Sequence, residues 1–125
     1  MSEAITRIAI SAYRPEEGKE QVLLSEVRDH HPLLWSEGLV TGRQPIILRA
    51  KDGTILEIFE WASPAAIEEA HDNPRVTAMW ERFARCCDYV PLSDLSEAAL
   101  LFAEFEPLDI EFPPRSEVPP DQREE

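Results

Sequence analysis

The tetrapeptide Lys51-Asp52-Gly53-Thr54 is the feature that most constrains how this chain can fold. Asp-Gly between two apolar runs is typical of a two-residue hairpin turn, in which both central residues favour a positive φ. The flanking runs, 46–50 and 55–61, are therefore predicted to be antiparallel strands, with Gln44-Pro45 leading into the first of them.

Two helix starts follow the hairpin, and both use the same device. Ser63 and Asn73 are good N-cap residues, and each precedes a proline at the first helical position, where the missing N–H costs nothing. We predict one helix from Pro64 to about His71 and a second from Pro74 to about Asp88. The second helix carries an apolar stripe with i, i+3, i+4, i+7 spacing: Val76, Met79, Trp80, Phe83 and Cys87.

The N-terminal part of the chain predicts a strand followed by a helix. Residues 5–13 are rich in apolar and β-branched side chains, which favours a strand. The helix after Pro15 should bury Val22, Leu23, Leu24 and Val27. Because Pro32 disfavours the helical conformation at the residue before it, we expect this helix to end near His31, with residues 33–35 forming an apolar clasp.

The C-terminal part changes character after a last apolar run. Residues 98–105, AALLFAEF, predict a fourth strand. Residues 107–125 include five prolines, six acids and two arginines. A segment of this composition buries too little apolar surface to offset the conformational entropy that it loses when it becomes ordered. We therefore expect one domain over 1–106 and an acidic, Pro-rich tail over 107–125, whose last dozen residues are mobile or lie on a partner subunit.

The resulting order of elements is strand, helix, strand–hairpin–strand, broken helix, strand. It is typical of the α+β ferredoxin-like βαββαβ sandwich. The first and fourth predicted strands are apolar on both faces; in the first, Ile8, Ile10 and Ala12 alternate with Ala9 and Ser11. A sheet with one face in water should alternate more cleanly, so we expect a homodimer through the β-sheet.

Charge and composition narrow the possible partners. The chain has 12 basic and 25 acidic side chains, a net charge of −13, which disfavours nucleic acid and anionic membranes. It shows no signal-peptide pattern and no apolar run near the roughly 18 residues needed to span a bilayer. The only cysteines, Cys86 and Cys87, are neighbours that make a poor disulfide pair, so we expect reduced thiols and a cytoplasmic location.

No pattern for a metal or cofactor is present. His30 and His31 are consecutive, so on a helix they project about 100° apart and cannot chelate one ion together. No other cluster of Cys, His and acidic residues has ligand spacing, and no Gly-rich phosphate loop or dinucleotide fingerprint occurs. We expect neither a metal nor a cofactor.

His71 is the candidate catalytic residue, with two interpretations open. An imidazole titrates near neutrality and could accept a proton from a phenol-like substrate. Alternatively, His71 bonds a backbone carbonyl that the bend at Pro74 frees.

A set of aromatic residues and one arginine are the candidate substrate-binding residues. The aromatic side chains either line a pocket or belong to the core: Tyr13, Trp35, Trp61, Trp80 and Phe83. Arg49 lies among apolar neighbours in a strand. It could bind a ligand carboxylate, or it could pair with Glu57 or Glu60 across the hairpin.

The element order, together with Trp61-Ala62-Ser63-Pro64-Ala65-Ala66 and the break at Ala70-His71-Asp72-Asn73-Pro74, resembles the antibiotic-biosynthesis-monooxygenase-like family of dimeric α+β barrels. The likeness covers roughly Ile5 to Pro107, and the stretch 32–41 running into 46–50 is similar to an uncharacterised subset of that family. The resemblance implies that two sheets pair into a closed barrel, with a small apolar pocket in each subunit between the sheet and the helices.

The resemblance also implies a function. It points to a cofactor-independent monooxygenase or isomerase acting on a small hydrophobic aromatic or polyketide-like compound, with His71 as base and Trp61, Trp80 and Tyr13 holding the substrate. The alternative is a non-catalytic small-molecule-binding or structural homodimer. A cavity next to His71 would favour the enzyme, and side chains packed solid around it would favour the alternative.

Overall fold

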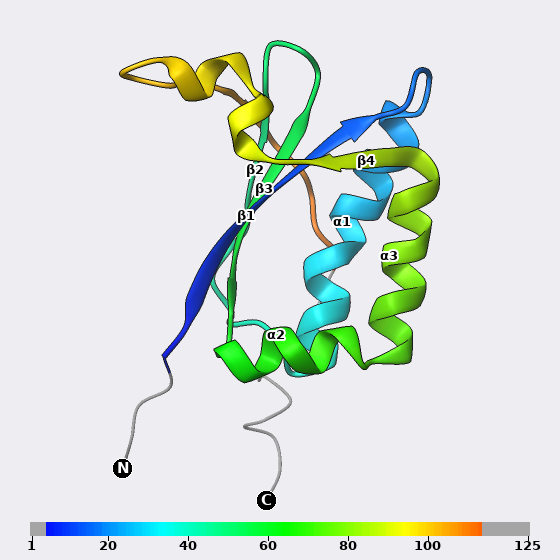
Figure 1. The fold of residues 1–125 in the computed structure, drawn as a ribbon. Coiled ribbons are helices and arrows are strands. Elements are labelled where there is room, and N and C mark those ends of the chain that lie inside the picture. Colours follow the sequence, from blue (N-terminus) through cyan, green and yellow to red (C-terminus); the bar gives the residue numbers. More distant parts are fainter. Residues whose placement is uncertain (1–4, 114–125) are drawn as a thin grey trace, which may run out of the picture.

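The predicted hairpin is present at the centre of the fold, in a computed structural model that describes residues 5–113 (Figure 1). It joins β2 (Ile46–Arg49) to β3 (Ile55–Trp61). The backbone N–H of Ala50 donates to the Thr54 carbonyl at 2.8 Å, so three residues lie between the closing pair, rather than the two expected. Gly53 supplies the positive φ, +93°, that such a loop needs.

The described residues form an open, five-stranded antiparallel sheet, and the α+β class is thereby confirmed. Its strand order is β4-β1-β3-β2-β5. At the two edges of the sheet, β4 pairs with β1 and β5 pairs with β2. The three strands not yet given bounds are β1 (Arg7–Pro15), β4 (Cys87–Val90) and β5 (Glu106–Leu108).

Three helices cover one face of this sheet. α1 (Glu20–Ser36) and α3 (Pro74–Cys86) lie side by side along it, and α2 (Pro64–His71) crosses one end (Figure 1). Both predicted helix starts are confirmed. Ser63 Oγ accepts from the Ala66 N–H at 3.0 Å, and Asn73 Oδ1 accepts from the Arg75 N–H at 2.9 Å.

The prediction that the first helix ends near His31 is wrong, because α1 continues through Pro32 to Ser36. The last turn buries Leu34 and Trp35 in the core, and the His31 ring donates from Nε2 to the Thr41 carbonyl at 3.1 Å. A proline in a helix forfeits one backbone hydrogen bond, and here burial of two large apolar side chains outweighs that loss.

The predicted fourth strand is also misplaced. The fourth strand in the chain is β4, which begins directly after α3 and pairs with the edge of β1 that faces away from β3. Residues 98–105 instead contain the end of a short 3₁₀ turn and irregular chain. Leu101 and Phe102 are 89% and 79% exposed. Apolar content alone does not distinguish a buried strand from an exposed apolar segment, so the sequence pattern misled the assignment.

The C-terminal segment joins the domain beyond the boundary predicted at 106. β5 spans that boundary, and Leu108, Ile110 and Phe112 then pack against the core. The prediction for the last dozen residues lies outside the described part of the chain. Within the described part, no helix has the length and apolar character needed to cross a membrane.

The sheet face away from α1 and α3 is only partly covered. Its open part, the open face, consists of Ile8, Ile10, Ile46 and Ile58, of which the first three are exposed and Ile58 is half-buried. The rest of this face is covered by residues 92–105, the apolar arm, which projects on the side away from the helices (Figure 1). The tip of the arm carries exposed Leu100, Leu101 and Phe102.

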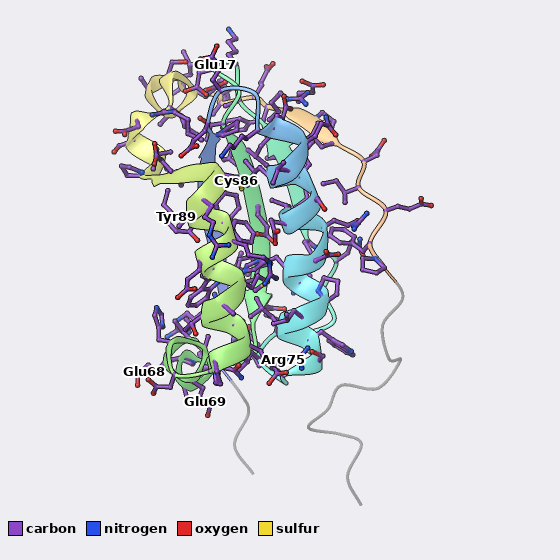
Figure 2. All side chains as sticks on the ribbon, turned by 90° about the vertical axis from the view of Figure 1, so that its right-hand side faces the viewer. Glu17, Glu68, Glu69, Arg75, Cys86 and Tyr89 are labelled. Carbon is purple, nitrogen blue, oxygen red and sulfur yellow. The ribbon has the colours of Figure 1, made fainter. Side chains whose placement is uncertain are left out.

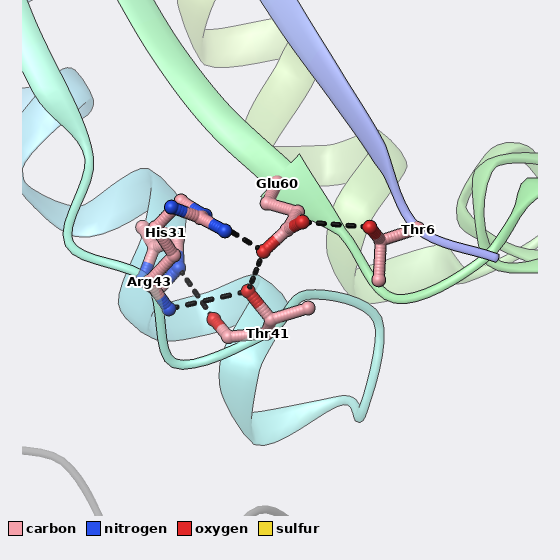
Figure 3. Close-up of polar contacts among 5 residues, drawn as sticks. All are labelled: Thr6, His31, Thr41, Arg43 and Glu60. Carbon is pink, nitrogen blue, oxygen red and sulfur yellow. Dashed lines mark hydrogen bonds and ion pairs between the residues drawn. The ribbon is translucent and has the colours of Figure 1, made fainter. Parts of the chain in front are cut away.

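A cluster of hydrogen bonds around the carboxylate of Glu60 holds the connection between α1 and β2 in place (Figure 3). Glu60, nearly buried at the end of β3, accepts hydrogen bonds from Thr6 Oγ1 at 2.7 Å, Thr41 Oγ1 at 2.8 Å and Arg43 Nε at 2.9 Å. These bonds, with that from Thr6 the largest cause, lower the pKa of Glu60 to about 2.

The pH dependence of stability should report this cluster. Because the Glu60 pKa is depressed on folding, its contribution is fully present above the unfolded value of 4.5 and is lost as the pH falls toward about 2. We expect Glu60→Gln to be less stable than the wild type at neutral pH and to lose less stability over that acid range. Urea unfolding at a series of pH values measures this.

The matched control is Glu68→Gln, on the exposed surface of α2 (Figure 2). Glu68→Gln should lose as much stability as the wild type when the pH falls from 4.5 toward about 2, a loss that we call the acid limb of the stability curve. An unchanged acid limb in Glu60→Gln would contradict the role given to this cluster.

Candidate functional site

A cavity of about 270 Å³ lies between the helix-covered face of the sheet and the helices. Strands β1, β3 and β4 and all three helices contribute to its lining. We call it the aromatic pocket, and its lining residues are Ser11, Tyr13, His30, Phe59, Trp61, His71, Trp80 and Tyr89.

Strand periodicity explains how the sheet builds its part of the pocket. Ser11 and Tyr13 are two residues apart in β1, as are Phe59 and Trp61 in β3, so each pair faces the helices. The rings of Phe59 and Trp61 are in contact, with centroids 5.3 Å apart. The inner wall is therefore a set of aromatic rings held by two neighbouring strands.

A buried carboxylate lies behind this wall. Glu57 is 0% exposed, in the middle of β3. The Tyr13 hydroxyl donates to Glu57 Oε1 at 2.7 Å, and His30 Nδ1 lies 3.0 Å from Oε2 and 2.9 Å from Oε1. A charge without access to water must be compensated by such partners, and here they come from β1 and α1.

The hydrogen atoms on His30 follow from its second partner. Trp80 Nε1–H can only donate, so His30 Nε2, 3.2 Å away, accepts from it. In the neutral ring the hydrogen is then on Nδ1, which donates to Glu57. We call the four connected residues Tyr13, Glu57, His30 and Trp80 the buried polar chain.

The two tyrosines of the pocket remain protonated at neutral pH. Burial, followed by the charge of Glu57, raises the pKa of Tyr13 well above its ordinary value. Burial likewise raises the pKa of Tyr89 to about 12. The imidazoles of His30 and His71 are therefore the groups in the described lining whose ring nitrogens can serve as bases.

His71 is exposed and contributes to the pocket from the end of α2. Its Nδ1 donates to the Ile67 carbonyl at 2.9 Å, and its ring contacts Trp80 edge-on with centroids 5.1 Å apart. His71 thus has a backbone carbonyl partner, although the carbonyl lies one turn back in α2 rather than at the bend before Pro74. The contact with the Ile67 carbonyl agrees with the structural interpretation of His71, and its place in the lining agrees with the catalytic one.

The other predicted binding residues lie outside the pocket lining. Phe83 packs behind it, with ring centroids 5.0 Å from Tyr13 and 5.3 Å from His30, and Trp35 is buried in the core. The structure therefore brings together Tyr13, Trp61, His71 and Trp80 and leaves out Trp35, Phe83 and Arg49.

The pairing predicted for Arg49 is wrong. Arg49 forms ion pairs with Glu20, in the first turn of α1, and with Glu106 of β5 at 3.1 Å. Glu57 is engaged in the buried polar chain, and Glu60 is held by the cluster of Figure 3, so neither is available to Arg49.

The sequence analysis missed four residues of the pocket lining, Ser11, His30, Phe59 and Tyr89, and the carboxylate behind it, Glu57. His30 and Glu57 matter most for the chemistry. The signal for His30 was its place in the stripe Leu23, Val27, His30, Leu34, which is the buried side of α1. The signal for Glu57 was an acid that alternates with Ile55 and Phe59 on the buried face of β3. A polar residue at a position where the helix or strand pattern predicts a buried apolar side chain is a candidate site residue.

The two cysteines carry no reactive site. Both are free and buried. Burial raises the pKa of each thiol, that of Cys87 to about 12, so neither is a thiolate at neutral pH. Among residues 5–113 no group of three or more His, Cys, Asp or Glu side chains could hold a metal ion.

Comparison with known proteins adds no assignment. No protein-family model matches the chain, and no curated protein and no solved structure shows significant similarity to it. The functional argument therefore depends on the residues of the pocket themselves.

The buried polar chain should make a measurable contribution to stability. Tyr13→Phe removes one donor to a buried carboxylate, and we expect it to lower the free energy of unfolding by about 1.5–3 kcal/mol. Tyr89→Phe is the matched control: its ring contacts Tyr13 but is more than half exposed, so a loss below about 0.5 kcal/mol is expected. Urea denaturation compares them, and equal losses would contradict the role of the Tyr13 hydroxyl.

Proposed function

We propose that this protein is a small-molecule enzyme of the antibiotic-biosynthesis-monooxygenase-like class. In this proposal it is a cofactor-independent monooxygenase or isomerase whose substrate, a small hydrophobic aromatic or polyketide-like compound, binds in the aromatic pocket. The observation that carries the proposal is the cavity itself, around which Tyr13, Trp61, His71 and Trp80 converge from four elements. The cavity next to His71 favours a protein that binds a ligand there over one in which side chains of the protein fill this region.

The strand order supports the proposed class. Leaving aside the added edge strand β5, the order β4-β1-β3-β2 is that of a ferredoxin-like βαββαβ sheet. The family assignment rests on this order and on the two motifs, 61–66 and 70–74, at which β3 leads into α2 and α2 into α3.

The pocket has the character expected for a compact, largely apolar ligand. Its volume of about 270 Å³ lies just below the range of about 300–1,000 Å³ for small-molecule sites and suits one or two fused rings. Aromatic rings form most of the lining, and the polar groups are few: two imidazoles, two tyrosine hydroxyls, the Ser11 hydroxyl and the Trp N–H groups. An imidazole at such a site is suited to general acid–base catalysis.

We further propose that the protein is a homodimer whose subunits meet through the sheet. The open face presents a row of isoleucines, and the apolar arm projects on the same side of the sheet (Figure 1). Each copy thus carries an apolar face and an apolar projection beside it. A two-fold axis would place the arm of each copy against the sheet of the other, which is the self-complementary arrangement of an isologous interface.

Blocking the pocket tests the proposed function. Ser11→Phe places a ring at the pocket lining from β1, and Ala78→Phe adds the same ring on the exposed surface of α3 as the matched control. With a panel of naphthols, larger polycyclic phenols and poly-β-keto esters, oxygen uptake and chromatography of products measure turnover. We expect turnover by the wild type and Ala78→Phe and a loss of about tenfold or more in Ser11→Phe.

The other outcomes separate the alternatives. Ligand binding without turnover would assign the protein to the non-catalytic binding class. Absence of both binding and turnover with the whole panel would contradict a role for the aromatic pocket.

Sedimentation tests the homodimer. Ile10→Glu introduces a charge on the open face. Val22→Glu introduces the same charge on α1, where Val22 is exposed and not buried as the sequence predicted; the two side chains are 47% and 52% exposed. We expect a dimer at micromolar concentration for the wild type and Val22→Glu and a monomer for Ile10→Glu. A well-folded wild-type monomer at that concentration would contradict the proposed interface.

A further inference from the structure

We propose that His30, backed by Glu57, is the group that takes a proton from the ligand, and that this ligand carries an acidic hydroxyl, either a phenol or an enol. The assignment rests on the proposed function, because it requires a ligand in the aromatic pocket. It goes beyond that function by placing the proton transfer at one atom, Nε2 of His30, and by naming the chemical group that this atom recognises.

The position of Glu57 is the first argument. His30 donates from Nδ1 to a carboxylate that is 0% exposed, at 2.9–3.0 Å. When Nε2 accepts a proton, the imidazolium that forms is already hydrogen-bonded to a negative charge, in surroundings that water does not screen. The Tyr13 hydroxyl, at 2.7 Å from Oε1, holds the carboxylate in place. Tyr13 and Glu57 are therefore positioning residues, and His30 is the residue that contacts the ligand.

The comparison with His71 is the second argument. His71 Nδ1 donates to the carbonyl of Ile67, a neutral group, and its side chain is exposed to solvent. A proton on His71 therefore gains no buried counter-charge. Of the two imidazoles in the pocket lining, His30 is the one whose surroundings favour a cation that forms during the reaction.

The lining of the pocket selects the ligand class. Among residues 5–113 the lining includes no lysine or arginine, so a ligand that arrives as a carboxylate or phosphate would meet no positive charge there and would lie close to Glu57. A neutral hydroxyl group avoids this cost and still provides a proton. A phenol or enol meets both conditions, with an apolar body that matches the aromatic wall.

The proton transfer exchanges hydrogen bonds already present in the pocket. The ligand hydroxyl takes the place of Trp80 Nε1–H at His30 Nε2, the two nitrogens being 3.2 Å apart in the structure. The ligand O–H bond breaks, its electron pair stays on the ligand oxygen, and the proton bonds to Nε2. The Trp80 N–H is thereby released from His30 Nε2. Phenolates and enolates are electron-rich at carbon, which is the starting point for either oxygenation or isomerisation.

A matched pair of probes tests the assignment: 4-nitrophenol and 4-nitroanisole, which differ by a methyl group in place of the acidic hydrogen. Equilibrium dialysis at a pH below the ionisation of free 4-nitrophenol gives the two affinities, and the visible spectrum shows whether the bound phenol is ionised. We expect the wild type to bind 4-nitrophenol about tenfold or more tightly than 4-nitroanisole, as for one hydrogen bond to a charged group, and the bound probe to show the phenolate band.

Four variants locate the proton acceptor. His30→Gln should abolish the phenolate band and the preference for 4-nitrophenol, while 4-nitroanisole should still bind. Trp80→Phe removes the donor that competes for Nε2 and should increase the ratio of the two affinities. His71→Gln changes the other imidazole of the lining and tests the competing assignment: the band and the ratio should persist, even if both affinities change together. Circular dichroism verifies that each variant is folded. If His30→Gln does not fold, Glu57→Gln, which is nearly isosteric, replaces it as the test and should weaken the phenolate band.

The outcomes separate this inference from the proposed function. Equal affinities for both probes without a phenolate band would overturn the role of His30 while leaving the pocket as a binding site. Loss of the band in His71→Gln, with the band retained in His30→Gln, would overturn it in favour of His71. Failure of the wild type to bind either probe would contradict the proposed function, and this assignment with it.

Discussion

The rest of the structure depends on a single buried charge, the carboxylate of Glu57 in the central strand β3. Burying an ion costs several kcal/mol unless partners replace the lost water, and here the partners come from different elements. Tyr13 brings β1 to it and His30 brings α1, and through Trp80 the connection reaches α3. The register of two strands and the placement of two helices are thus tied to one side chain, in a way that apolar contacts, which are not directional, do not achieve.

The parts of the fold that could be predicted from the sequence are those fixed by neighbouring residues. Gly53 marks the hairpin, and Ser63 and Asn73 mark helix starts, because a turn or a cap is decided within four or five positions. The end of α1 and the position of the fourth strand are decided by distant contacts. Pro32 is a correct local signal against helix, yet the core on the far side of Leu34 determines the outcome. Residues 98–105 have the composition of a strand but no strand beside them with which to pair.

The candidate site divides in the same way. Aromatic residues attract attention one by one, and Tyr13, Trp61 and Trp80 do surround the pocket. The chemistry lies in a pair, His30 and Glu57, that are 27 positions apart and ordinary when taken singly. The sequence analysis considered His30 only together with its neighbour in the chain, His31. The neighbour that matters is Glu57, an acid in β3 that lies next to His30 in space. The partners of Arg49 escaped notice for the same reason, since Glu20 and Glu106 come from opposite ends of the chain.

The junction of α3 and β4 has no connecting loop: the helix ends at Cys86 and the strand begins at Cys87. The Glu16 N–H fixes this joint by donating to the Cys86 carbonyl at 2.9 Å. Trp80 and Tyr89, one on each side of the joint, are opposite ends of one continuous rigid piece of pocket wall. An inserted residue at the joint would rotate one wall against the other, whereas insertions in the apolar arm would leave the pocket untouched. Over evolutionary time, length variation in this fold should therefore accumulate in the arm and be excluded from the joint.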